Sequence, residues 1–380
     1  MFKIFKKKKK VEEVVEVFDP EKLNTISDKK TEHSGVEADN IERQQVESEH
    51  SFNSNATLPE VCESLTAFMN KNGIELDFSS ARGLISAMGT TRLVFLKHPN
   101  TELVRKFIQV LSEFFKIGNY YENSSTLWKT TTDVLLAYKN GEYKKSNVLN
   151  AIMAGKKDPN NILFTTLFNV YPSSFTYFDD FMNYVKNPIS STGVYISSGK
   201  GNKGKGQFLE MPKNLWFFMV LSEEFDQPLS KNITDYAMVI NLGMREIEPH
   251  YDIFGNDKLM SFNQFLRKIN VAADEHFLNE DLWKKIDRFE DFMDLKTDFS
   301  IGNKAACQLE EYTAAYIACG GEEKDAVDSV LTNKLLPMAN SVFDFKEDTE
   351  DRNTAAFLDK TFGEDNCIYA QKELDRMKSR

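Results

Sequence analysis

Glycines and lysines alternate in the stretch Ser197–Gln207, which reads Ser-Ser-Gly-Lys-Gly-Asn-Lys-Gly-Lys-Gly-Gln. Such a composition could bind phosphate, because glycine lets backbone N–H groups approach an anion and lysine supplies positive charge. A phosphate-binding loop, however, lies directly between a buried strand and a helix. The flanking residues here are the short apolar runs Val194–Ile196 and Phe208–Leu209. They predict a β-hairpin whose tip is mobile.

The charge of the chain limits what this tip can bind. The 380 residues carry a net charge of −11, and nucleic-acid coat proteins need a basic surface. We therefore expect a flexible loop, with contact to nucleic acid or another acidic partner as the alternative. Its basic residues are Lys200, Lys203 and Lys205.

Other chemistry-bearing residues are dispersed. The cysteines form no C-x-x-C pair and the five histidines are far apart, so we expect no metal site and buried thiols in the reducing cytoplasm. Adjacent residues on a helix point about 100° apart, so Asp179 and Asp180 indicate a solvated helix face rather than a catalytic carboxylate pair. No spacing predicts a nucleophilic catalytic set. The cysteines are Cys62, Cys307, Cys319 and Cys367.

Residues 1–56 are polar and charged, with few aromatic residues and no sustained periodicity. This segment predicts a disordered tail, because it cannot bury enough surface to offset its conformational entropy. Its first residues lack the apolar region of a secretory signal. Apolar side chains beside a lysine block, from Phe2 to Lys10, could also touch an anionic membrane surface weakly. No apolar run approaches the ~20 residues of a membrane span.

Short apolar runs come after the tail and alternate with amphipathic helical patterns. The runs predicted as strands lie at 92–96, 162–168, 215–221 and 237–242. This alternation indicates an α/β core over residues 57–250, with a parallel sheet covered by helices on both faces.

The pattern becomes all-helical toward the C-terminus and predicts a helical domain at 257–380. One apolar helical stripe runs from Ala305 to Cys319 and is followed by Gly320–Gly321, which predicts a C-terminal cap. The next stripe runs from Ala326 to Leu331, and we expect that helix to stop at Pro337.

The order of these segments resembles the AAA+ ATPase domain of the McrB-like branch, the nucleotide-driven motors of methylcytosine-restriction systems. The segment Met211–Ile240 is similar to the family's Pro-x-Asn strand and the Pro-Leu-Ser and Asp-x-Ala motifs after it. The segment Phe299–Pro337 is similar to the family's helical lid. The resemblance covers about 80–380. It implies an AAA+ (P-loop NTPase-like) parallel sheet followed by an all-helical lid domain.

The family's phosphate-binding loop aligns with residues 97–104, and its functional residues are missing. A working loop reads G-x-x-x-x-G-K-[ST]. Lys97, Asn100 and Glu102 stand where the resemblance implies glycines. Leu103 replaces the phosphate-binding lysine, and Val104 replaces the hydroxyl residue that binds Mg²⁺.

At four further positions this chain also lacks the functional residue that the resemblance implies. Phe168 and Asn169 replace the Asp-Glu pair that binds Mg²⁺ and activates water, and Ser222 replaces the sensor asparagine. Tyr236 stands where the family has an arginine that reaches a neighbour's nucleotide. Lys304 matches the basic sensor of the lid.

Absence of several charge-stabilising groups leaves no credible phosphoryl transfer. The sequence therefore predicts a pseudo-ATPase with no catalytic residue and no bound cofactor. It would act as a scaffold, cap or regulator on a protein partner, such as an active AAA+ relative or an effector nuclease. Arg245 is a candidate substitute for the lost arginine.

The alternative is an enzyme: a divergent nucleotide-binding AAA+ motor with a relocated phosphate site. It would use Lys97, Lys304 or the lysines of the 197–207 loop. The resemblance also implies a defence or restriction complex as its setting.

Overall fold

The computed structural model describes residues 56–139, 142–187, 192–196, 207–221, 227–249, 259–349 and 353–379. Several predictions from the sequence concern residues outside these ranges. They are the tail before Ala56 with Phe2 to Lys10, the lysines Lys200, Lys203 and Lys205, and Ser222.

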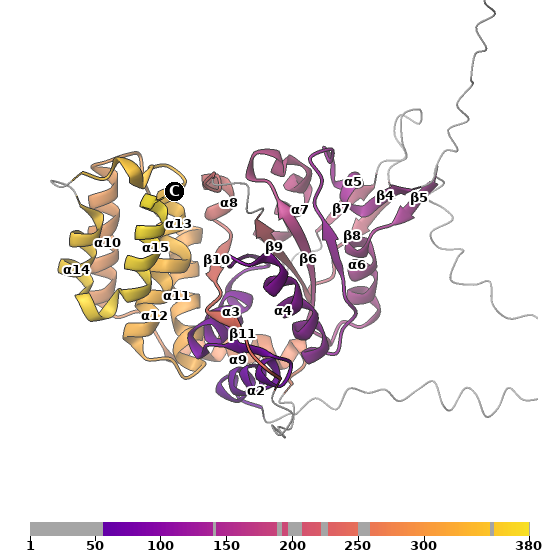
Figure 1. Cartoon of the computed structure of the whole chain (residues 1–380), viewed down its shortest axis with the longest axis horizontal. Coiled ribbons are helices and arrows are strands. Elements are labelled where there is room, and N and C mark those ends of the chain that lie inside the picture. Colours follow the sequence, from indigo (N-terminus) through magenta and orange to yellow (C-terminus); the bar gives the residue numbers. More distant parts are fainter. Residues whose placement is uncertain are drawn as a thin grey trace, which may run out of the picture.

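A five-stranded parallel sheet forms the centre of the molecule, in the order β10-β2-β9-β6-β3. The strands are β2 (Leu93–Lys97), β3 (Tyr121–Asn123), β6 (Leu163–Val170), β9 (Leu215–Leu221) and β10 (Met238–Asn241). Figure 1 shows the sheet between its helices, with the C-terminal helices gathered beside β10. The predicted fold class, a parallel α/β sheet followed by a helical region, is confirmed.

Both faces of this sheet are buried, which explains why its strands read as continuous apolar runs. In β2, Val94 and Leu96 face one cluster of buried side chains, whereas Leu93 and Phe95 face another. The alternation follows from the two-residue period of a strand.

The helices of the α/β core divide between these two clusters. On the first face lie α2 (Leu58–Lys71), α3 (Phe78–Thr90) and α4 (Thr101–Phe114). On the second face lie α5 (Thr131–Leu135), α6 (Asn147–Lys157), the 3₁₀ helix η1 (Pro172–Phe178), α7 (Asp179–Lys186) and the short helix α8 (Lys231–Thr234). Helix α4 ends at Phe114, and Lys116 then takes a positive φ of 55°.

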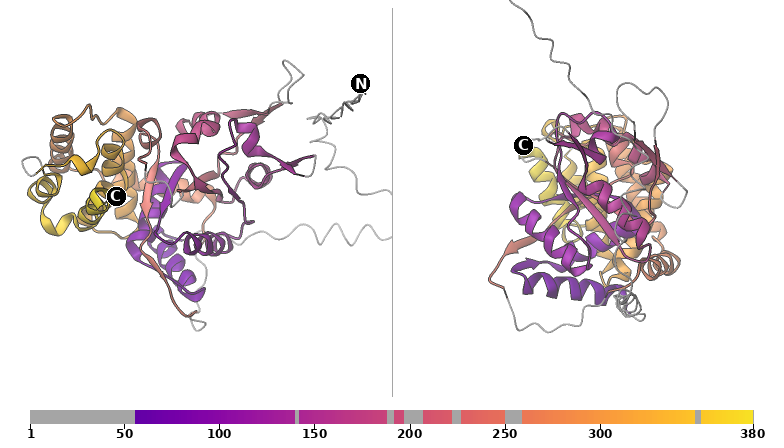
Figure 2. Two further views of the ribbon diagram at one scale, coloured as in Figure 1. Left: turned by 45° about the horizontal axis from the view of Figure 1, so that its top comes forward. Right: turned by 90° about the vertical axis from the view of Figure 1, so that its right-hand side faces the viewer.

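Three small antiparallel pairs accompany the central sheet. They are β1 (Ile74–Leu76) with β11 (Met244–Glu246), β4 (Leu136–Lys139) with β5 (Glu142–Lys145), and β7 (Gly193–Ile196) with β8 (Gln207–Glu210). The β7–β8 hairpin was predicted from the sequence and is confirmed. Figure 2 shows the β4–β5 and β7–β8 pairs at the end of the molecule opposite the C-terminal helices.

The C-terminal region is helical throughout its described residues, and we call it the lid. Its helices are α9 (Phe262–Glu275), α10 (Glu280–Asp294), α11 (Asn303–Ala318), α12 (Glu323–Val330), η2 (Leu331–Leu335), α13 (Leu336–Asn340), η3 (Phe345–Glu347), α14 (Thr354–Phe362), η5 (Glu364–Asn366) and α15 (Ile368–Ser379). The predicted cap of α11 is confirmed: Gly320 has a φ of 85°, and Gly321 N donates to Tyr316 O at 3.1 Å.

The prediction that a helix stops at Pro337 is wrong. A π-helical turn, η2, comes directly after α12, and α13 continues through Pro337. Proline has no N–H to donate and its ring clashes with the carbonyl four residues earlier, but a π turn widens the helix at that point. The chain therefore passes the proline without breaking.

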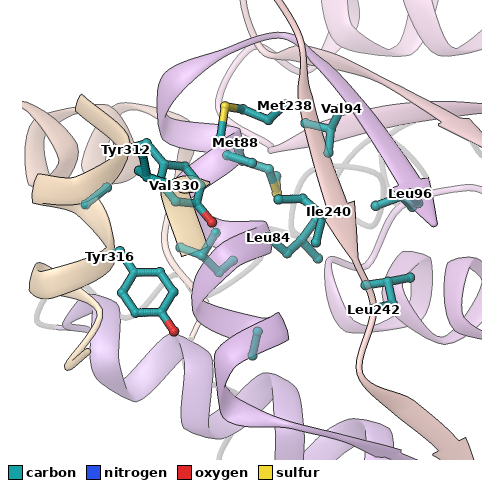
Figure 3. Close-up of a cluster of buried hydrophobic side chains, with 14 of the residues drawn as sticks. Leu84, Met88, Val94, Leu96, Met238, Ile240, Leu242, Tyr312, Tyr316 and Val330 are labelled. Atoms are coloured by element: carbon teal, nitrogen blue, oxygen red, sulfur yellow. The ribbon is translucent and has the colours of Figure 1, made fainter. Parts of the chain in front are cut away.

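The lid and the core share one hydrophobic cluster. Helix α3 packs between the sheet and the lid. In Figure 3 its Leu84 and Met88 lie between Ile240 of β10 and the lid residues Tyr312 and Val330. Each of these five side chains is at most 3% exposed. The lid is thus attached to the core by close packing rather than by a polar surface alone.

Among the residues that the structure describes, no helix combines the length and the apolar character that crossing a membrane requires.

Candidate nucleotide site

The junction between β2 and α4 is the position that the AAA+ resemblance assigns to the phosphate-binding loop. Only His98, Pro99 and Asn100 join the end of the strand to the start of the helix. The loop motif needs more chain than this, because its backbone must wrap around phosphate oxygens. No glycine is present to let the backbone do so.

Side chains of the junction occupy the backbone donors at the start of α4. Asn100 Oδ1 accepts a hydrogen bond from Leu103 N at 3.0 Å. His98 Nδ1 accepts from Asn100 N at 3.0 Å, and its Nε2 lies 3.1 Å from Met244 O, which it reaches as a donor. The end of α4 that would face an anion is thereby capped within the protein itself.

The positions of the phosphate lysine and the Mg²⁺ hydroxyl belong to the hydrophobic core. Leu103 is 6% exposed and Val104 is fully buried. Phe168, at the position of the Mg²⁺-binding aspartate, is also fully buried and lies 4.2 Å from the guanidinium of Arg105. Glu102 points to solvent, with 82% of its side chain exposed. Leu103, Val104 and Phe168 thus belong to the packed interior, whereas Glu102 faces solvent.

Lys97, at the end of β2, binds a carboxylate of the lid. Its Nζ lies 3.1 Å from Oε1 of Glu373 in α15, and the Glu373 side chain is 4% exposed. Arg376 Nη2 donates to the same oxygen at 2.7 Å and to Asn241 Oδ1 at 3.2 Å. The ammonium group of Lys97, which could otherwise bind a phosphate, is therefore paired with the Glu373 carboxylate. This bridge also ties α15 to the ends of β2 and β10.

Asn169 lies where the β6–β9 register shifts between Leu167 and Val170. It has a positive φ of 55°. Asparagine tolerates this left-handed conformation better than most residues, so the local backbone accounts for the residue type.

Tyr236 and Lys304 lie away from the β2–α4 junction. Tyr236 O accepts from Thr91 Oγ1 at 2.7 Å and from Gln308 Nε2 at 3.1 Å, on the side of the sheet where β10 begins. Lys304 lies in the first turn of α11 and interacts with Glu311. Arg245, the candidate substitute arginine, is paired with Glu75 at 2.6 Å. The structure therefore brings neither Tyr236 nor Lys304 to Lys97.

A second cation joins the lid to the start of β10. Lys334 is 1% exposed, and its Nζ donates to Thr234 O at 2.6 Å, Gln308 Oε1 at 2.7 Å and Ala237 O at 3.1 Å. Burial lowers the pKa of Lys334 to about 7. Because three oxygens match the three donors of an ammonium group, this contact fastens the lid to the core directly.

A cavity of about 170 Å³ lies between α3, the end of β10 and the lid. It is smaller than the roughly 300–1,000 Å³ typical of small-molecule sites. Asn241 Nδ2 is a buried donor without a protein partner at this wall. The polar residues of the lining are Asp77, Ser79, Ser80, Asn241, Ser329, Thr332, Asn333 and Tyr369. A cavity of this size is too small for a nucleoside triphosphate.

Sequence reasoning did not find Glu373, Arg376 or Lys334. They lie outside any loop motif, and their roles depend on contacts with residues that are about 100 to 280 positions away in the chain. Within the described ranges, no group of three or more His, Cys, Asp or Glu residues could hold a metal ion.

The chain is similar in structure to a putative ATPase from Cytophaga hutchinsonii, with a TM-score of 0.44 and 11% sequence identity. That match covers 73% of this chain and 86% of the other. No family model and no curated protein matches the chain.

Proposed function

We propose that this chain is a catalytically inactive AAA+-like protein that acts as a scaffold or regulatory subunit through protein–protein contacts. The closed β2–α4 junction carries the proposal. Its three linking residues are capped on themselves, and Leu103 and Val104 are core residues. Phosphoryl transfer needs cations and donors around the phosphates, and here those positions are apolar or already bonded.

The contacts between core and lid support the same proposal. In a nucleotide-driven motor, ligand binding must change how the two parts sit, since a ligand shifts only equilibria for which it has differential affinity. In this chain the Lys97–Glu373 and Lys334 contacts join the two parts through protein groups alone. A fixed core–lid shape is the property that a scaffold needs. The partner would be an active AAA+ relative or an effector protein, in the cytoplasm.

Nucleotide titration tests the proposal. ATP and GTP with Mg²⁺ are titrated into the full chain by calorimetry, and thermal melts are recorded in parallel. A ligand at 100 times its Kd would add about 2.7 kcal/mol to the free energy of unfolding. We expect no heat of binding and an unchanged melt at millimolar nucleotide. A saturable shift would contradict the proposal and favour the divergent motor, and replacing Lys97 would then test whether its phosphate site has moved to that lysine.

A further inference from the structure

Three apolar side chains are exposed where the first turn of α3, in the core, meets the first turn of α15, in the lid. Phe78 is 49% exposed, Ile368 is 47% exposed and Tyr369 is 48% exposed. Ser79, which follows Phe78, and Tyr369 line the same cavity between core and lid. We call Phe78, Ile368 and Tyr369 the seam surface. Apolar groups exposed together, unlike single scattered ones, are typical of an interaction site.

Hydrogen bonds hold both halves of the seam surface in place. Ser79 Oγ lies 3.0 Å from the hydroxyl of Tyr316 in α11, and Figure 3 shows Tyr316 beside α3. The N–H groups of Tyr369 and Ala370 both donate to the carboxylate of Asp328 in α12, each at 2.8 Å. The seam surface is therefore preformed, and it spans core and lid.

The start of α2 lies close to the seam surface. A Cβ atom at Gly320 would lie 3.6 Å from Cβ of Pro59 and 3.9 Å from Nη2 of Arg82. The Arg82 guanidinium in turn lies 5.7 Å from the ring centroid of Phe78. The chain that precedes Ala56 therefore joins the described structure beside this surface.

Carboxylates outnumber cations around the seam surface. The segments that form and border it, 57–63, 77–82, 322–328 and 364–376, contain eleven acidic and four basic residues. Burial, together with the carboxylates of Asp77, Asp328 and Asp325, raises the pKa of Tyr369. The acidic residues are Glu60, Glu63, Asp77, Glu322, Glu323, Asp325, Asp328, Glu364, Asp365, Glu373 and Asp375.

The four cations of these segments are already engaged within the protein. Arg82 lies over the Phe78 ring, and Lys372 Nζ lies 5.5 Å from the ring centroid of Tyr369. Lys324 pairs with a neighbouring glutamate at 3.0 Å. The fourth cation, that of α15, shares its carboxylate with the lysine at the end of β2. The balance of charge at the seam surface is therefore negative.

The segment Phe2–Lys10 of the same chain has the complementary chemistry. It contains three apolar residues, six lysines and no acidic residue. The 45 residues between Lys10 and Ala56 can span up to about 150 Å when extended, so length does not limit its reach. Binding within one chain also needs no second molecule at high concentration.

We propose that residues 2–10 dock on the seam surface of their own chain, with their apolar side chains against it and their lysines among the surrounding carboxylates. Apolar contact supplies the affinity, and opposite charge selects this segment and orients it. A docked segment bridges core and lid and withholds the seam surface from other proteins. This inference does not rest on the proposed loss of ATPase activity.

Photo-crosslinking of the full chain tests the inference. Phe5→p-benzoylphenylalanine is irradiated at low protein concentration, and the cross-linked peptides are identified by mass spectrometry. A mixture of ordinary and ¹⁵N-labelled chains separates cross-links within one chain from those between chains. We expect cross-links within one chain to residues 77–82 and 364–372. Their yield should fall as salt is raised, because salt screens the exposed charges.

Variants of the seam surface sharpen the test. Phe78→Ser/Tyr369→Ser should lower the yield of these cross-links at least about 10-fold, because the apolar contact is lost. Tyr195→Ala/Phe208→Leu is the matched control. These two rings are 65% and 48% exposed on the β7–β8 hairpin, at the end of the molecule opposite the lid, so their loss should leave the yield unchanged.

A second pair of variants tests the role of charge. Glu322→Gln/Asp365→Asn should lower the yield and weaken its salt dependence. Asp291→Asn/Asp294→Asn, at the far end of α10, removes the same charge from the lid and should change neither. All variants are compared under conditions in which their thermal melts show a folded protein.

Three results would overturn the inference. They are the absence of cross-links within one chain to the seam surface, an unchanged yield in Phe78→Ser/Tyr369→Ser, and cross-links that form only between chains. If cross-links are absent and the full chain sediments with phosphatidylserine vesicles, residues 2–10 bind a membrane surface instead. None of these results bears on nucleotide titration, so this inference and the proposed function fail separately.

Discussion

The ends of β2 and β10 lie side by side in one parallel sheet, with Lys97 paired to Asn241. Protein groups close the space beyond β2, whereas a cavity remains beyond β10. Beyond β2 the short junction caps α4, and the lid carboxylate of Glu373 occupies the lysine. Beyond β10 a cavity of about 170 Å³ remains between core and lid. Two neighbouring strand ends therefore differ in their contact with the lid: the end of β2 forms an ion pair with it, and the end of β10 borders a cavity.

The difference comes from the residues at the carboxyl end of each strand. After β10, Gly243 N donates to Ser80 Oγ at 2.6 Å, and Gly243 O accepts from Asp77 N at 2.9 Å. These small groups leave room beside the lid. After β2, the helix starts at once and carries Leu103 and Val104 into the core. The comparison shows that a short junction and one opposing carboxylate are enough to close one strand end of the sheet.

Placing the motif's lysine and hydroxyl residues at the start of α4 should destabilise the protein without creating a nucleotide site. The double variant Leu103→Lys/Val104→Thr places a charge and a hydroxyl in a packed core. We expect the free energy of unfolding to fall by about 4 kcal/mol, and no ATP binding, because buried Leu is lost and a charge is desolvated. Urea unfolding with a constant m-value measures the loss.

Glu102→Lys is the control for this variant, since the Glu102 side chain is exposed, and it should change stability by no more than about 0.5 kcal/mol. A stable double variant that binds ATP would show that the closed end is a consequence of side-chain identity alone.

Removal of the Glu373 carboxylate tests how much the Lys97–Glu373 ion pair contributes to stability. Glu373→Ala leaves Lys97 and Arg376 without their shared acceptor, and we expect a loss of about 3 kcal/mol. Lys97→Met/Glu373→Leu should lose less than the sum of the single variants, because the double variant leaves neither Lys97 nor Glu373 as an uncompensated charge and only Arg376 loses its acceptor. Glu322→Ala, which breaks the exposed Lys324 pair, should cost nearly nothing. Additive single effects would show that Lys97 and Glu373 are not coupled.

The second core–lid cation predicts a pH dependence. Burial lowers the pKa of Lys334 from 10.5 to about 7, so between these values the unfolded chain binds more protons than the folded chain. Stability contributed by this group therefore rises from pH 7 toward pH 10, by up to about 1.4 kcal/mol per pH unit. Buried tyrosines such as Tyr184, whose pKa burial raises to about 12, act only above that window.

The measurement is the difference in unfolding free energy between the parent chain and Lys334→Met at pH 7, 8 and 9. The parent curve should climb relative to the variant. Parallel curves would mean that the three oxygens around Nζ keep the ammonium form through this range.

The last prediction concerns thiol reactivity, which changes no stability and reports whether the lid stays in contact with the core. A hydrogen bond with the Cys319 thiol, together with burial, raises the pKa of Cys62, so α2 and the end of α11 meet at these sulfurs. Cys367 is also buried, whereas Cys307 is exposed. Ellman's reagent should therefore react with one thiol in the folded chain and with four after denaturation. Rapid reaction of Cys62 or Cys319 under native conditions would show that the lid separates from the core.

Much of the fold was predictable because it depends on local pattern. Apolar runs located β2, β6, β9 and β10, since strands buried on both faces leave a continuous signal. The edge strand β3 and the β4–β5 hairpin were not predicted. Tyr121–Asn123 is only three residues long, and β4 continues from α5 without a break, so neither presents a periodic pattern of its own. Pro337 misled the prediction because a π turn upstream overrides its local effect.

At the candidate site, too, some features were predictable from the sequence and others depended on packing. The sequence by itself determined that residues 97–104 contain no glycine and carry Leu103 and Val104 at the motif's lysine and hydroxyl positions, because residue type settles charge and hydrogen-bonding capacity. Only the tertiary structure decided what occupies that position instead. Glu373 reaches Lys97 across 276 residues of sequence, and Phe208 covers Gly193 only once the hairpin has paired. Such contacts depend on how whole elements pack, and packing is a property of the complete chain rather than of any segment.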